Sequence, residues 1–110
     1  MKKTFYKLRI PDSVAELISE MHPHLKKKIR GSLQTILDDP NSGKYLKDEL
    51  AGLWSFRVSK FRIIYRIAEG KHIEVIAVGP RKHIYEETFR IISREKESKY
   101  KDKHYPENGN

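Results

Sequence analysis

Three strand-like segments in quick succession constrain the fold more than any other feature of the sequence. Residues 54–59 alternate apolar and polar side chains, and residues 61–67 alternate again after one intervening residue. Gly70 lies in a predicted hairpin turn, and residues 72–78 form a third segment that is apolar on both faces. This succession predicts an antiparallel meander in which the third strand is internal.

Helical patterns precede and follow this meander. Residues 3–10 suit a first strand, whereas residues 13–21 and 24–38 carry apolar side chains at helical spacing and meet at Pro23. A last helix is predicted over residues 85–94. The predicted fold class is α+β in the order β-α-α-β-β-β-α: a small, mostly antiparallel twisted sheet packed against an N-terminal helical hairpin and a C-terminal helix, with the helices on one face.

The distribution of charge separates a body from a tail. At 110 residues the chain has the length of one domain, which we expect over residues 1–94, with residues 44–53 irregular. The net charge is +8, and residues 95–110 add nothing to it because they hold four lysines and four acidic residues. This polar segment is expected to be a flexible tail. The positive charge belongs to the body and favours an anionic partner, nucleic acid first.

The absence of cysteine excludes several classes of protein. A disulfide framework, a thiolate zinc site and a cysteine nucleophile all need that residue. No apolar run reaches the roughly 20 residues that cross a bilayer, so we expect a cytoplasmic protein without a membrane partner. The segment His22-Pro23-His24 lacks carboxylates and zinc spacing, which predicts a turn, and we expect neither a metal nor a cofactor.

Arginines on one side of the predicted sheet are the most informative chemical feature. Arg57 and Arg62 lie on the strand faces without the aromatic rows, and Arg81 directly follows the third strand. Arg81, His83 and Tyr85 alternate, so an extended backbone would point all three the same way. Guanidinium groups bind phosphate oxygens in a bidentate manner. The alternative, ordinary solvent-facing arginines on a one-sided sheet, is favoured by periodicity alone.

Basic residues of the second predicted helix are weaker candidates. Lys26, Lys27 and Arg30 are possible contacts to RNA phosphates. They also fit the solvated face of an amphipathic helix, which is the favoured interpretation, although the two roles are compatible. Composition alone equally permits an RNA-binding module without chemistry.

Residues 52–58, 61–67 and 73–85 together resemble the RelE/ParE superfamily of toxins from type II toxin–antitoxin systems, most closely its RelE branch. The resemblance covers residues 3–94 and has the order of elements predicted above. Toxins of the RelE type are ribosome-dependent endoribonucleases that cut messenger RNA, and a co-encoded antitoxin silences them. The resemblance implies mRNA, the ribosome and a cognate antitoxin as partners, in a toxin–antitoxin hetero-oligomer, with a toxin that is monomeric alone.

The resemblance also implies roles for individual residues. Arg57 matches a basic position that contacts phosphate, Arg62 the arginine of the next strand, and Arg81 the arginine that stabilises the transition state. Tyr85 matches a tyrosine that stacks on or deprotonates the substrate, and His83 stands where other members carry a catalytic histidine. Tyr85 or His83 would be the general base. Arg57 or His83 would assist the leaving oxygen, and Arg81 with Arg62 would clamp the phosphate.

The sequence departs from the family at Ser55, where some relatives carry a second basic residue. Lys60 and Lys82 are candidate RNA-binding replacements for it. The resemblance implies metal-independent attack by the 2′-hydroxyl, which leaves a 2′,3′-cyclic phosphate and a 5′-hydroxyl. The alternative within the superfamily is a ParE-like toxin that poisons DNA gyrase without nuclease activity and does not need these site residues together.

Overall fold

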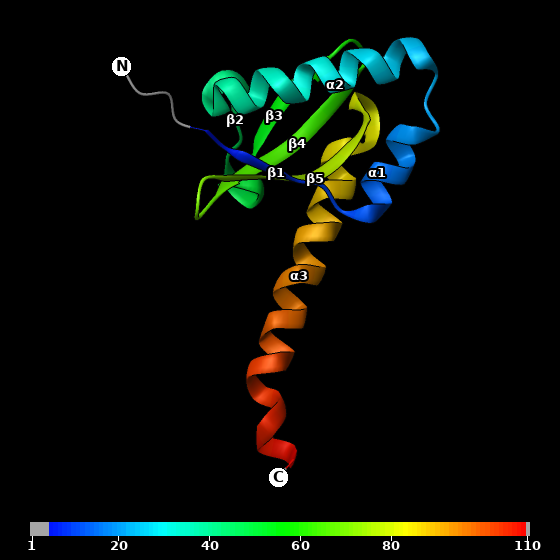
Figure 1. Ribbon diagram of the computed structural model, residues 1–110. Helices are drawn as coiled ribbons and strands as arrows, with labels where there is room; N and C mark the ends of the chain where they lie inside the picture. Colours follow the sequence, from blue (N-terminus) through cyan, green and yellow to red (C-terminus); the bar gives the residue numbers. More distant parts are fainter. Residues whose placement is uncertain (1–4, 110) are drawn as a thin grey trace.

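The computed structural model describes the backbone of residues 5–109 and the side chains of residues 5–97. Its five strands form one sheet in the order β1-β5-β4-β3-β2 (Figure 1). The strands are β1 (Lys7–Arg9), β2 (Lys44–Tyr45), β3 (Trp54–Val58), β4 (Phe61–Ala68) and β5 (His72–Pro80). The helices are α1 (Asp12–Ser19), α2 (Pro23–Asp38) and α3 (Arg81–Gly109), with two short 3-10 turns, Pro40–Ser42 and Asp48–Leu50.

The strand pairing confirms the predicted meander. β3 and β4 are antiparallel, as are β4 and β5, and the third strand of the meander is internal because β1 pairs with it in parallel. The α+β class, with a sheet packed against an N-terminal helical hairpin and a C-terminal helix, is confirmed. The expectation that residues 44–53 are irregular is wrong at one point, because β2 pairs antiparallel with β3 at the sheet edge.

Helices cover both faces of the sheet rather than one, which corrects the sequence-based expectation. On one face α1 and α2 pack against β4 and β5 through a cluster that includes Ile29, Ile36 and Ile63. On the other face Ile64 and Ile84, the latter from α3, belong to a second buried cluster. Two-sided burial follows because β4 and β5 carry apolar side chains on both faces.

Tyr65 fixes the segment that leads into β2. Its side chain is fully buried, and its hydroxyl donates a hydrogen bond to the Pro40 carbonyl (2.7 Å) and accepts one from the Gly43 N–H (3.2 Å). Burial raises the pKa of this phenol, so it stays neutral and able to donate. The neutral hydroxyl therefore ties the loop after α2 to the centre of the sheet.

The turn predicted at His22-Pro23-His24 acts as a helix cap. The His22 Nδ1 atom accepts a hydrogen bond from the His24 N–H at 3.1 Å, and Pro23 is the first residue of α2. Proline is well suited to that place because the first N–H of a helix has no intrahelical partner. Both histidines therefore belong to the start of a helix.

The last helix is longer than the predicted range 85–94. α3 begins at Arg81, immediately after β5, and continues to Gly109, so its C-terminal part extends away from the body (Figure 1). The flexibility expected of residues 95–110 stays a prediction. Among the described residues, no helix is long and apolar enough to cross a membrane.

Candidate functional site

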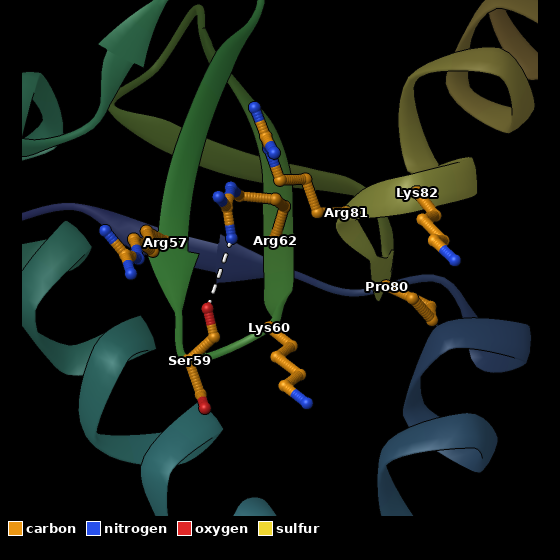
Figure 2. A pocket seen from close by; sticks show the side chains of 7 residues that line it. All are labelled: Arg57, Ser59, Lys60, Arg62, Pro80, Arg81 and Lys82. Carbon is orange, nitrogen blue, oxygen red and sulfur yellow. Dashed lines mark hydrogen bonds between the residues drawn. The ribbon is translucent and has the colours of Figure 1, made fainter.

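A cationic cavity lies where the β3–β4 turn meets the junction between β5 and α3. Its volume is about 770 Å³. Figure 2 shows the side chains that line it: Arg57, Ser59, Lys60, Arg62, Pro80, Arg81 and Lys82. Five of these seven residues are cationic, and no acidic residue of the described chain is among them. A cavity of this composition is suited to a polyanion.

The strand register brings two of the arginines together. Arg57 on β3 pairs directly with Arg62 on β4, and Arg62 pairs with Gly79 on β5. Residues directly opposite each other in an antiparallel pair project from the same face, and like charges in that arrangement repel. α3 approaches this row closely, because a Cβ on Gly79 would lie 3.1 Å from Ile84 Cδ1. The register therefore brings the backbones of the two arginines together beside the start of α3, although the Arg57 side chain points away from Arg62 in Figure 2.

Hydrogen bonds to backbone carbonyls connect the residues at the rim of the cavity. The Arg81 N–H donates to the Lys60 carbonyl at 2.9 Å and joins the start of α3 to the β3–β4 turn. Arg62 Nη1 donates to the carbonyls of Phe61 (2.9 Å) and Ser59 (3.3 Å, dashed in Figure 2). Ser59 has a positive φ of 58°, which makes the turn tight. These hydrogen bonds thus connect the β3–β4 turn, β4 and the start of α3, which carry most of the cations of the cavity.

The ion pairs of the described residues lie elsewhere. Arg66 Nε contacts Glu74 at 2.6 Å, and its two terminal nitrogens bind the Glu95 carboxylate at 3.0 and 3.1 Å. Arg9 also contacts Glu74, at 2.9 Å. None of the cavity's cations takes part in an ion pair within the described part of the chain. Arg66 is therefore neutralised locally, whereas the arginines at the cavity keep their charge for a ligand.

Tyr85 lies next to this row of arginines. Its hydroxyl is 3.0 Å from the Ser55 Oγ atom, and Ser55 lies two residues before Arg57 on the same face of β3. Arg81 and Tyr85 are four residues apart in α3, which puts them on one side of the helix. The structure therefore groups Arg57, Arg62 and Arg81 with Tyr85 nearby.

His83 does not join this group. The predicted extended backbone over residues 81–85 is wrong, because α3 begins at Arg81. In a helix of 3.6 residues per turn, His83 points about 200° around the axis from Arg81. Its side chain is exposed and does not line the cavity.

The five basic residues proposed as RNA contacts divide into two groups. Lys60 and Lys82 line the cavity, although their amino groups point away from Arg62 in Figure 2. The remaining three, Lys26, Lys27 and Arg30, belong to α2, which covers the opposite face of the sheet from α3, and they lie outside the cavity.

Lys44 is a basic residue that the sequence reasoning missed. It pairs with Ser55 across β2 and β3 and so projects from the face that carries Arg57. A second hollow of about 360 Å³ lies there, lined by Ser42, Gly43, Lys44, Ser55, Phe56 and Arg57. Arg57 borders both hollows, which makes the cationic surface continuous. A two-residue strand has no periodicity, so the sequence offered no signal for this position.

Metal ligands are not concentrated anywhere in the described residues: no group of three or more histidine, cysteine, aspartate or glutamate side chains could hold an ion.

Together, the fold and the cavity define a small α+β protein with a cationic surface at one end of its sheet. The family model described as "ParE toxin of type II toxin-antitoxin system, parDE" matches residues 8–85. The chain therefore belongs to this toxin family, within the RelE/ParE superfamily. The match includes Arg57, Arg62 and Arg81. No curated protein sequence matches the chain.

Solved structures of toxins share the fold. A chain of the RelBE toxin–antitoxin complex from Mycobacterium tuberculosis is 23% identical, with a TM-score of 0.63, over 71% of this chain and 100% of that one. A mutant of the Escherichia coli toxin RelE in the free state is 18% identical, with a TM-score of 0.64, over 83% and 98%. A chain of the YoeB–YefM complex from Staphylococcus aureus is 21% identical, with a TM-score of 0.54, over 69% and 97%.

Proposed function

We propose that this toxin is an endoribonuclease that cleaves messenger RNA on the ribosome and so inhibits translation. The observation that carries the proposal is the cavity bordered by Arg57, Arg62 and Arg81, none of which has a carboxylate partner among the described residues. Arginine is the side chain best suited to phosphate, because its planar fork donates two parallel hydrogen bonds.

The chemistry needs no resident metal. The ribose 2′-oxygen attacks the adjacent phosphorus, and the bond from phosphorus to the 5′-oxygen breaks, which leaves a 2′,3′-cyclic phosphate and a 5′-hydroxyl. Arg62 and Arg81 stabilise the charge that builds on the phosphoryl oxygens. Tyr85, acting as a phenolate, accepts the 2′-hydroxyl proton and becomes a neutral phenol. Arg57 stabilises the departing 5′-oxygen until it takes a proton from solvent.

The partners follow from charge and from the relatives. The net charge of +8 favours association with ribosomal and messenger RNA, and Lys26, Lys27 and Arg30 on α2 offer a second basic face. Chains of similar fold occur in toxin–antitoxin complexes. We expect a cognate antitoxin with an acidic or amphipathic segment, a cytoplasmic hetero-oligomer, and a monomeric toxin when the antitoxin is absent.

A second candidate function is gyrase poisoning, because the family model that matches the chain describes the ParE toxin. A toxin of that kind would use the fold as a binding surface and would tolerate the loss of Arg81. A third candidate, RNA binding without chemistry, would need the cations but would not break the strand.

Mapping of mRNA 5′ ends after a pulse of toxin expression in bacterial cells separates these functions. The wild-type protein should create new ends within translated codons, and Arg81→Ala should remove them. Arg94→Ala, which deletes an equal charge from an exposed position on α3, is the matched control and should cleave like the wild type. DNA-damage signalling without new mRNA ends would establish gyrase poisoning instead. Undiminished cleavage by Arg81→Ala would contradict the proposal.

A further inference from the structure

We propose that Ser55 is a positioning residue that holds the Tyr85 hydroxyl on the face of β3 that carries Arg57; this inference rests on the proposed function. Ser55 is 6% exposed, and its Oγ atom lies 3.0 Å from the Tyr85 hydroxyl. A buried hydroxyl needs a hydrogen-bond partner, and no buried polar side-chain atom of the described residues lacks one. The Tyr85 hydroxyl is the partner of Ser55.

The surroundings of Ser55 keep its hydroxyl in place. Ser55 lies in the interior of β3, paired with Lys44 on one side and with Ile64 on the other. Its carbonyl is also close to the loop before β2, since a Cβ on Gly43 would lie 2.9 Å from it. The hydroxyl that meets Tyr85 is therefore carried by a backbone that is bonded along both edges.

The direction of the hydrogen bond follows from the proposed reaction. An ionised phenol has no proton to donate, so in that state Ser55 must be the donor and Tyr85 the acceptor. The bond fixes the Tyr85 oxygen next to Ser55 on β3, two residues before Arg57, before substrate arrives. A general base must lie within hydrogen-bond reach of the proton that it takes, so the position of the Tyr85 oxygen should affect the rate of the chemical step.

The same geometry explains why Ser55 departs from the basic residue of some relatives. A lysine at a site that is 6% exposed would have to extend its ammonium group out of the buried position and into the hollow beside Arg57. It would also displace the Tyr85 ring. The serine is thus an alternative arrangement, in which β3 supplies a hydrogen-bond donor to Tyr85 and leaves phosphate binding to the arginines.

A double-mutant cycle in the mRNA cleavage assay tests the inference. Ser55→Ala should lower kcat about tenfold with little change in KM, and Ser55→Thr, which keeps a hydroxyl, should restore most of it. Tyr85→Phe should lower kcat at least as much. The double variant should be no slower than Tyr85→Phe alone, since Ser55 acts only through Tyr85. Thermal unfolding of each variant checks that the fold is intact.

A spectroscopic measurement tests the contact without reference to activity. In protein labelled with carbon-13 at the tyrosine Cζ position, Tyr85→Phe identifies the Tyr85 signal. That signal should move in Ser55→Ala and return toward its wild-type position in Ser55→Thr.

The outcomes are distinct. An unmoved Tyr85 signal, wild-type kcat in Ser55→Ala, or losses that multiply in the double variant would each overturn the positioning role. Cleavage by neither the wild type nor any variant would overturn the proposed function, and the Tyr85 signal would then decide on the contact alone.

Discussion

Three arginines reach the candidate site from three different elements, and none of them has a carboxylate partner among the described residues. Arg57 and Arg62 are directly opposite each other in the pairing of β3 with β4, and the Arg81 N–H donates a hydrogen bond to the Lys60 carbonyl. Holding like charges together costs free energy, and a polyanion that binds among them lowers that cost. The uncompensated charge of these arginines therefore favours the binding of a polyanion.

Lys44 extends this cationic surface past Arg57, and its removal gives a prediction about binding. Lys44→Gln should weaken the binding of a single-stranded RNA severalfold and should reduce the slope of log affinity against log salt by about 0.7. Lys47→Gln, an exposed lysine in the following loop, is the control and should change neither quantity. Fluorescence anisotropy over a salt series measures both, and equal slopes for the two variants would show that Lys44 does not contact the RNA.

Two glycines should respond to alanine with opposite signs. A Cβ on Gly43 would lie 2.7 Å from the Tyr65 hydroxyl and 2.9 Å from the Ser55 carbonyl, so Gly43→Ala should lower the free energy of unfolding by about 1–3 kcal/mol. A Cβ on Gly31, inside α2, meets nothing within 4 Å, so Gly31→Ala should raise it by about 0.5–1 kcal/mol. Urea unfolding measures both. An unchanged free energy of unfolding in Gly43→Ala would contradict this prediction, because it would mean that the loop before β2 shifts to accommodate the methyl group at little cost.

At the scale of elements, α3 links the site to the rest of the sheet. Its first turn borders the cavity, and farther along it Glu95 holds Arg66 of β4 with two hydrogen bonds. Glu95→Gln should remove one charge of this contact and cost less than about 1 kcal/mol, because both side chains are partly exposed. Hydrogen exchange should become faster in α3 around residue 95 and stay unchanged in α2. Faster exchange in both helices would indicate global destabilisation instead.

The ion-pair network also predicts how stability depends on pH. The hydrogen bond from Arg66, followed by that from Arg9, lowers the pKa of Glu74 below its ordinary value of 4.5. A carboxyl whose pKa is lower in the folded state stabilises the fold above the unfolded value, and this contribution is lost as the pH falls through the folded value. Urea unfolding at pH 7 and pH 3 should show a smaller loss for Glu74→Gln than for the wild type. Equal losses would exclude Glu74 from the acid response.

The elements that the sequence predicted well are those with a clear period. Residues 61–67 alternate with period two and form β4, and residues 24–38 carry the helical period and form α2. β2 has only two residues and no period, and the start of α3 lacked a signal because Arg81-Lys82-His83 contains no apolar side chain. The position of His83 depends on where α3 begins. The sequence therefore misplaced His83, whereas Arg57, Arg62 and Arg81 do line one cavity, and their roles stay a prediction.

At the scale of the whole molecule, charge is arranged by face. The Arg66 network neutralises the part of the sheet that α3 covers, whereas the cavity beyond the start of α3 and the exposed side of α2 remain basic. A protein with two basic faces can contact ribosomal RNA with one while the other holds a messenger strand. Burial of both faces of the sheet was not predicted. On the face of β4 that α3 covers, Ile64 lies between Arg62 and Arg66, and the two arginines indicated a face exposed to solvent.

The most direct test of the central claim is the chemistry of the RNA ends produced in a purified translation system. Addition of the wild-type toxin, released from its antitoxin, should cut the translated mRNA and leave 2′,3′-cyclic phosphates and 5′-hydroxyls. Arg81→Ala should slow this cleavage at least a hundredfold, and Arg94→Ala should leave it unchanged. Arrest of translation by a toxin that leaves the mRNA intact, or equal cleavage by the wild type and Arg81→Ala, would contradict the account.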